Sequence, residues 1–253
     1  MVSMRQILVL VILILFGARL HGEQQSPADN DPASAAMETR AKELGLTGDI
    51  RKSIREKGSV IEFTFAEGVD MRRNSLQSGY YTKGPNGELI PAGPYKSDEE
   101  ALVHETYCGA SSAVVASFGG SRSRITKANS MVYTVSEFTV VQAPKSSDGI
   151  SVGMEIYVVN PGGTVVDGSE TIKMHAKGAV SFKTTEQYLL LLQPLKGAPS
   201  NYFTIASSQV AEVRDGKLYP ANEETAQVFA WGEPLTPALK RREDLVQRVP
   251  CGK

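Results

Sequence analysis

Residues 131–141 read MVYTVSEFTVV, and this stretch does most to decide the fold. Its β-branched and aromatic residues, uninterrupted by glycine or proline, predict a long β-strand. Residues 112–118 (SAVVASF) and 150–159 (ISVGMEIYVV) predict one strand before it and one after it. Residues 188–193 (YLLLLQ) are apolar and stop at Pro194, so this short run predicts a strand that is buried on both faces.

Polar turns separate these segments and further short strands follow. Residues 160–163 (NPGG) end the third strand, and short strands are predicted at 202–206 and 209–213, with a hairpin turn at 214–217 (RDGK). Strands that follow one another so closely, with no helical pattern between most of them, predict a mainly β fold. We expect a small closed antiparallel barrel of the OB-like kind, because closure leaves no long exposed strand edges.

The expected barrel domain covers residues 108–253 and is preceded by an α/β extension over residues 34–107. In the extension we expect two short helices within 34–56, a strand at 60–65 and a hairpin at 80–90.

Three local signals support these boundaries. Asn86-Gly87 supplies the positive φ angles that a tight hairpin turn needs. Ser97 stands three residues before Glu100, which is the capping-box spacing that opens a helix. Residues 237–249 carry apolar side chains among charges, so they predict a short amphipathic helix that closes the domain.

Residues 1–22 have the three-part plan of a secretory signal peptide. Arg5 precedes the unbroken apolar run ILVLVILILF at residues 7–16, and Ala18 and Gly22 offer two alternative cleavage sites. The run is about half of the roughly 20 residues that span a bilayer, so a stable membrane span is not expected. We therefore expect a secreted or periplasmic protein from which residues 1–22 are removed; an uncleaved anchor is the alternative.

The exported chain contains two cysteines, Cys108 and Cys251. Residues 23–33 (EQQSPADNDPA) come before them and are expected to form a flexible linker, because they offer almost nothing to bury. In an oxidising compartment such a cysteine pair commonly forms a disulfide, which here would tie the C-terminal tail to the start of the β domain. The alternative is two unrelated thiols.

The charge distribution argues against nucleic-acid binding. The formal net charge is −1, and 27 basic residues are interleaved with 28 acidic ones. Nucleic-acid-binding domains usually gather lysine and arginine on one face. The richest basic cluster, Lys240, Arg241, Arg242 and Arg248, is interrupted by acidic residues and is expected to be a solvated helix face.

The order of four segments resembles a β-barrel domain that recurs in uncharacterised exported bacterial proteins. The segments are AVVAS at 113–117, MVYTVSEF at 131–138, VVNPGGTV at 158–165 and EQYLLLL at 186–192. The domain is also similar, more remotely, to the OB-like barrel of the netrin and tissue-inhibitor type. The resemblance implies a fold over residues 108–219 and no function. Those inhibitors act through an N-terminal cysteine, whereas the first cysteine here is Cys108, so no inhibitory residue is carried over.

Motifs of common catalytic and cofactor sites are missing from the sequence. It contains no G-x-S-x-G nucleophile motif and no glycine-rich phosphate loop between a strand and a helix. Glu100, His104 and Cys108 share a helix face with metal-ligand spacing, but no second cysteine or histidine pair stands nearby, so a capped helix leading to a structural cysteine is favoured. No metal and no cofactor are expected. Paired carboxylates of a glycoside hydrolase stay open, because the fold sets their separation.

One loop carries a candidate binding site. Residues 121–127 (SRSRITK) are expected to link the first two barrel strands, and OB-type barrels bind ligands with such loops and the neighbouring strand face. Arg122, Arg124 and Lys127, with Tyr133 on the next strand, could hold an anionic sugar, a peptide carboxylate or a polymer. The alternative is a solvated loop.

These observations favour an exported, non-catalytic binding or interaction module. Its partner would be a protein or an anionic ligand in the envelope or extracellular space, and no nucleic-acid partner is expected. The alternatives are a hydrolase that acts on cell-envelope or extracellular polymer, and a structural part of an envelope complex. A deep cleft with converging carboxylates would favour the hydrolase.

Overall fold

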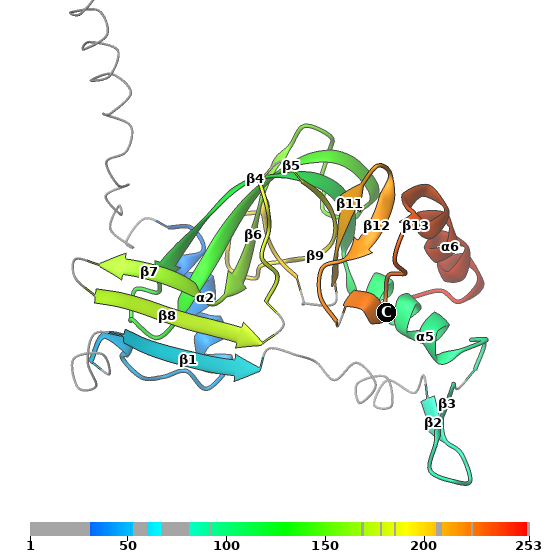
Figure 1. The fold of residues 1–253 in the computed structure, drawn as a ribbon, viewed down its shortest axis with the longest axis horizontal. Helices are drawn as coiled ribbons and strands as arrows, with labels where there is room; N and C mark the ends of the chain where they lie inside the picture. Colours follow the sequence, from blue (N-terminus) through cyan, green and yellow to red (C-terminus); the bar gives the residue numbers. More distant parts are fainter. Residues whose placement is uncertain are drawn as a thin grey trace, which may run out of the picture.

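The computed structural model describes residues 31–52, 60–66, 81–91, 93–167, 170–177, 179–184, 186–205, 209–223 and 225–251. This part of the chain is mainly β, as predicted, with one large sheet and a few short helices (Figure 1). The expected signal peptide and the expected linker up to residue 30 lie outside the described residues.

The strands fall into three sheets. The large sheet contains β4 (Ser112–Ile125), β5 (Val132–Ser146), β6 (Glu155–Pro161), β9 (Gln187–Pro194), β10 (Tyr202–Thr204), β11 (Val210–Arg214), β12 (Lys217–Pro220) and β13 (Glu233–Pro234). The second sheet contains β1 (Val60–Ala66), β8 (Glu170–Lys177) and β7 (Gly163–Asp167), and the third is the hairpin of β2 (Tyr81–Lys83) and β3 (Leu89–Pro91). The helical elements are α2 (Ser34–Glu43), α5 (Asp98–Gly109), the 3₁₀ turn η3 (Thr225–Gln227) and α6 (Leu235–Arg248).

Five strands of the large sheet pair in a ring. β4 pairs with β5, β5 with β6, β6 with β10, β10 with β9, and β9 with β4. All of these pairs are antiparallel except β6 with β10, which is parallel. The expectation of a purely antiparallel arrangement is therefore wrong, and the reason is arithmetic: strand direction cannot alternate all the way around a ring with an odd number of strands.

The inside of this ring is an apolar core. Val114, Ala116 and Phe118 of β4 face it together with Phe138 of β5, and all four side chains are buried. Phe138 meets the ring of Phe182 edge to face, with 4.9 Å between the ring centroids. Burying a side chain of this size contributes about 1.5–3 kcal/mol, so the ring interior is a main source of stability.

The second sheet lies at the end of the molecule opposite α5 and α6, where β7, β8 and β1 run side by side (Figure 1). Its core contains Ile172 and Met174 of β8, Val165 of β7 and Met37 of α2. β8 is absent from the predicted strands, although its apolar residues Ile172, Met174 and Ala176 alternate with polar ones. β1 confirms the strand predicted at 60–65, and it pairs in parallel with β8.

The predicted capped helix and closing helix are both confirmed. The side chain of Ser97 accepts a hydrogen bond from the backbone N–H of Glu100 at 3.2 Å, and α5 begins at the next residue. Val103 of α5 and Leu239 and Leu245 of α6 belong to one core that covers the outer face of the large sheet.

Arg242 corrects the expectation of a solvated basic face on this closing helix. Its side chain is fully buried, and its guanidinium donates to the carbonyl oxygens of Ala238 (2.8 Å) and Val228 (2.9 Å). The carbonyl of Ala238 lies one helical turn away, and Val228 belongs to the segment that α6 covers. A contact with a distant segment cannot be read from charge spacing along one helix.

The predicted hairpin forms, but its turn is longer than expected. β2 and β3 are joined by residues 84–88, where the N–H of Gly84 donates to the carbonyl of Glu88 at 2.8 Å. Gly87 has a φ of 82°, whereas Asn86 is not among the residues with positive φ. A type I′ turn needs positive φ at both of its central positions, so this type of turn does not form here.

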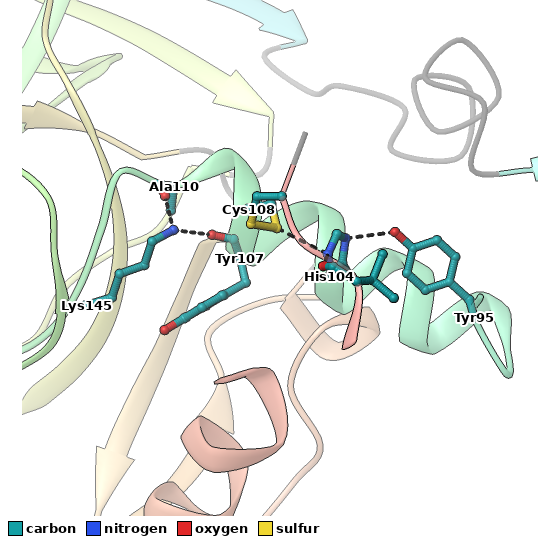
Figure 2. Close-up of a disulfide and its surroundings, with 8 residues drawn as sticks. Tyr95, His104, Tyr107, Cys108, Ala110 and Lys145 are labelled. Atoms are coloured by element: carbon teal, nitrogen blue, oxygen red, sulfur yellow. Dashed lines mark hydrogen bonds between the residues drawn. A yellow bond between two sulfur atoms is a disulfide. The ribbon is translucent and has the colours of Figure 1, made fainter. Parts of the chain in front are cut away.

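The predicted disulfide between Cys108 and Cys251 is confirmed, with 5.4 Å between the two Cα atoms. It ties the end of α5 to the tail that follows α6 (Figure 2). His104, one turn earlier on α5, donates from Nε2 to the carbonyl oxygen of Val249 at 2.6 Å, and its Nδ1 lies 2.9 Å from the Tyr95 hydroxyl. Because a carbonyl oxygen only accepts, the Nε2–H of His104 is the donor to Val249.

Replacing both cysteines by serine is expected to lower the free energy of unfolding by about 2–5 kcal/mol. The physical reason is that the bridge joins residues 143 positions apart, so its loss frees a large loop in the unfolded chain. Urea unfolding of the wild type and of the double variant measures the difference. Equal midpoints for the two proteins would contradict it, and the reduced wild type should match the double variant.

Candidate functional site

A cleft of about 710 Å³ opens where the ring of strands meets β8. Its lining comes from α2, β4 to β10 and the segment before β9, and it is rich in hydroxyl and amide groups. The described lining residues are Arg40, Leu44, Ser121, Ser123, Thr134, Ser136, Asn160, Pro161, Gly162, Gly163, Thr164, Lys173, Met174, His175, Ala176, Ala179, Val180, Ser181, Phe182, Gln193, Thr204 and Ile205. Segments from most of the chain therefore converge on one space.

A β-bulge places the hydroxyl groups in this cleft. β4 and β5 pair with three shifts of register, and the last of them lies between Phe118 and Gly120. Successive side chains of a strand point to opposite faces, so an extra residue exchanges the two faces from that point on. Before the shift, Phe118 faces the ring interior; after it, Ser121 and Ser123 share that face, and Arg122 does not.

Ser121 and Ser123 of β4 each lie opposite a hydroxyl side chain of β5, which gives two cross-strand pairs. Ser121 lies opposite Ser136, and Ser123 lies opposite Thr134, with 3.0 Å between Ser123 Oγ and Thr134 Oγ1. The inner face of the ring is thus apolar around Phe138 and hydroxyl-bearing where it opens into the cleft.

Gly162 and Gly163 fit closely against these hydroxyls. Both have positive φ angles, 95° and 136°, which residues other than glycine rarely adopt. A Cβ atom at Gly163 would overlap with Ser123 Oγ and Thr134 Oγ1. Thr134 donates to the carbonyl oxygen of Gly162 at 2.8 Å, so the predicted Pro-Gly-Gly turn forms one wall of the cleft.

The ionisable side chains on the cleft are all basic among the described lining residues. Arg40 comes from α2, and Lys173 and His175 come from β8. Arg40 also forms an exposed ion pair with Glu43, 3.0 Å between Nη1 and Oε2. The cleft therefore combines cations, hydroxyls and amides, which is the donor set that a polar anion requires.

The residues of the predicted binding loop lie on two paired strands and on the turn between them. Residues 121–125 belong to β4 instead of forming a loop, and the turn before β5 begins only at Thr126. Arg122 and Lys127 are exposed, while Tyr133 is fully buried, directly across from Arg124. The bulge turns Arg122 and Arg124 away from the face that carries the cleft, and sequence spacing gave no sign of this shift.

Arg124 is held by a carboxylate from the N-terminal segment. Its Nε lies 2.7 Å from Oδ2 of Asp31, and the two side chains are only 20% and 2% exposed. Burial raises the pKa of the neighbouring Tyr133 well above its ordinary value, and the charge of Asp31 raises it further. Ala33 beside this ion pair is fully buried, so the last residues of the expected linker pack against the β-sheet.

Replacing Asp31 by alanine is expected to lower the free energy of unfolding by about 2 kcal/mol, because Arg124 keeps a largely buried charge without a counterion. Chemical denaturation measures the change. Glu43→Ala is the matched control: it removes the exposed partner of Arg40 and should cost at most about 0.5 kcal/mol. An equal decrease of the free energy of unfolding in both variants would contradict the larger contribution expected of the Asp31–Arg124 pair.

The expected line of Glu100, His104 and Cys108 serves structure. Cys108 is bonded to Cys251, so its sulfur offers no thiolate to a metal ion. Glu100 accepts from the backbone N–H of Lys96 at 2.6 Å and pairs with Arg248, which ties α6 to the start of α5.

A second hollow of about 740 Å³ lies between α5 and α6. Its charged side chains include two opposite pairs, Arg248 with Glu100 and Lys240 with Asp244. The two charges of each pair neutralise each other, so this hollow offers less to a charged ligand than the cleft at the ring.

Two carboxylates meet where Glu186, the residue before β9, reaches Glu212 of β11, and neither is among the described residues that line the cleft. Glu186 hydrogen-bonds to Glu212, and this bond together with burial and the Glu212 charge raises the pKa of Glu186. Arg214 forks onto Glu212 and lowers the pKa of that carboxyl. Carboxyls in direct hydrogen bond are closer than the roughly 5–10 Å that glycoside hydrolases need, so this pair does not have hydrolase geometry.

Glu186→Gln is expected to raise the thermal midpoint near neutral pH and to leave it unchanged near pH 4. A raised pKa in the folded state means that Glu186 loses stability as the pH rises above its unfolded value of about 4.5. Glutamine removes that loss and can still donate to Glu212. Thermal unfolding at both pH values measures the effect, with the exposed Glu223→Gln as control. A midpoint gain that is the same at both pH values would contradict the explanation.

No model of a known protein family matches the chain, and no curated protein matches it either. Within the described part of the chain, none of the helices has the length and apolar character needed to cross a membrane.

Proposed function

We propose that this protein is an exported, non-catalytic binding module that holds a small anionic, hydroxyl-bearing ligand in the cleft between the ring of strands and β8. A sugar acid has this chemistry: one carboxylate and several hydroxyl groups. The proposal takes the partner expected from the sequence, an anionic ligand outside the cytoplasm, and assigns it to a different face of β4.

The observation that carries the proposal is the composition of the cleft. Lys173 can neutralise a carboxylate, while Ser121, Ser136 and Asn160 offer hydrogen bonds to hydroxyl groups. The volume of about 710 Å³ lies within the range of roughly 300–1,000 Å³ that is typical of small-molecule sites. Hydrolases of glycosidic bonds commonly use two carboxylic acids, and none is among the described lining residues, which supports binding over hydrolysis.

The strand order supports an OB-like barrel. β4, β5 and β6 follow one another, and β9 returns to lie beside β4, which gives the spatial order of a Greek key. β10 then pairs with both β6 and β9. OB-type barrels are five-stranded Greek keys that bind oligosaccharides and other ligands with their second and third strands, and here β5 and β6 supply Thr134, Ser136 and Asn160 to the cleft.

Export is supported by the disulfide together with the leader sequence. Bridges such as Cys108–Cys251 persist in oxidising compartments and are rare in the cytosol. The apolar run at residues 7–16 has the length of a signal peptide, so we infer a secreted or periplasmic location.

Calorimetric titration of the mature protein with glucuronate and with glucose tests the function. We expect saturable binding of glucuronate that is at least tenfold tighter than that of glucose, because glucose lacks the carboxylate. Lys173→Met keeps the apolar stem and removes the charge, so it should weaken glucuronate binding about tenfold, or ~1.4 kcal/mol, and leave glucose unchanged.

Lys196→Met is the control, since Lys196 is exposed in the turn after β9 and does not line the cleft. It should bind glucuronate as the wild type does. Absence of binding to glucuronate and to the other sugar acids galacturonate and gluconate would overturn the proposal, and so would equal losses in the two lysine variants.

A further inference from the structure

The chain has a single tryptophan, and its side chain is 70% exposed. Trp231 lies in the segment that joins η3 to β13, at the end of the large sheet that also carries β12. A large aromatic side chain gains much by burial, so one held in water at a defined place indicates an interaction surface.

The segment that carries Trp231 is held on the side of α6 by the buried guanidinium of Arg242. Arg242 of α6 donates to the carbonyl of Val228 at 2.9 Å, and its guanidinium lies 4.7 Å from the centroid of the buried Phe229 ring. Burial lowers the pKa of Arg242 to about 10, which reflects the cost of holding this charge away from water. The two residues that Arg242 holds, Val228 and Phe229, stand three and two positions before the exposed tryptophan.

Further contacts fix the other side of the segment. Gly232 has a φ of 70°, and its N–H donates to the carbonyl of Leu218 in β12 at 2.9 Å. Glu233 forms an ion pair with Arg241, 3.2 Å between Oε1 and Nη2. Trp231 is therefore held between two anchored neighbours, and little conformational entropy remains to be lost when it binds.

Tyr219 of β12 stands beside the indole. The two ring centroids are 5.9 Å apart and the ring planes are inclined by 72°. The guanidinium of Arg214 lies 5.0 Å from the centroid of Tyr219 and also forks onto the carboxylate of Glu212. Two aromatic rings thus meet at an angle, bordered by polar groups.

The charges around these rings cancel one another. Arg214 is matched by Glu212, and Arg241 by Glu233. Binding to an anionic membrane surface depends on an excess of lysine and arginine beside the aromatic residues, which this arrangement does not provide. Among the described residues, the other exposed large apolar side chains are Ile90, Val152 and Val166, which come from other segments of the chain.

We propose that Trp231 and Tyr219 form an aromatic platform that binds the sugar rings of a neutral polysaccharide. A sugar ring has an apolar face of C–H groups and a rim of hydroxyls. The exposed indole suits the apolar face, and the half-exposed guanidinium groups of Arg214 and Arg241 can donate hydrogen bonds to the hydroxyls.

The single tryptophan makes the test direct, because all indole fluorescence reports on this platform. The mature protein is titrated with hydroxyethylcellulose, dextran and a hexamer of N-acetylglucosamine. We expect a saturable blue shift of the emission with at least one of them, and slower migration in a native gel that contains the same polymer.

Trp231→Ala should abolish the retardation in the gel, and Trp231→Phe should keep part of it. Tyr219→Leu, which retains the fluorescent indole, should weaken binding at least threefold. Val152→Ala is the matched control, because it removes another exposed apolar side chain, 66% exposed, outside the platform. Circular dichroism of each variant verifies that the fold is retained.

Three results would overturn the proposal: no spectral shift and no retardation with any of the three polysaccharides, equal retardation of wild type and Trp231→Ala, or a blue shift with phosphatidylcholine or phosphatidylserine vesicles and none with sugar polymers. The platform is independent of the cleft at β8. Glucuronate binding should be unchanged in Trp231→Ala, so failure of either proposal can be recognised separately.

Discussion

The constraint on which the rest of the structure depends is the shift of register between Phe118 and Gly120 in β4. Before the shift, alternate side chains of β4 fill the ring with apolar groups, which stabilise the fold. After it, the same inner face carries Ser121 and Ser123, and Arg122 and Arg124 point to the other face. A regular strand would aim Arg122 and Arg124 into the ring, where their desolvation would be costly. The bulge therefore produces both a dry core and a polar cleft from one continuous strand.

Each end of the described part of the chain is fixed to this core by a buried or covalent link. At the N-terminal side, Asp31 neutralises Arg124, and α2 covers the strands beside it. At the C-terminal side, Cys251 is bonded to Cys108, and His104 holds the carbonyl of Val249. Lys145 adds to this end by donating to the carbonyls of Tyr107 and Ala110, where α5 ends and its carbonyls lack helical partners. Helix ends and chain ends are thus satisfied by groups far away in the sequence.

The two proposed binding surfaces use different chemistry and lie on different strands. The cleft gathers cations and hydroxyls on β4, β5, β6 and β8, and suits a small anion. The aromatic platform on β12 and the segment after η3 has balanced charge and an exposed indole, and suits a neutral polymer. A module of this kind would stay on a polysaccharide through Trp231 while its cleft takes a soluble ligand. Buried Arg242 links stability to the second surface, because it orders the residues before Trp231.

The sequence by itself determined the features that depend on neighbouring residues. The mainly β character, the capped start of α5 at Ser97 and the closing helix followed from local pattern and composition. The bridge between Cys108 and Cys251 was predicted from the presence of two cysteines, with two unrelated thiols as the alternative, and the structure contains the bridge. Only the tertiary structure decided which face of β4 points inward, that Arg242 is buried, and that Lys173 and His175 meet the hydroxyls of β4 and β5. Serine and threonine are too common to mark a site along a chain, and one inserted residue exchanges the two faces of a strand. The site therefore depends on contacts across strands, and sequence spacing does not contain them.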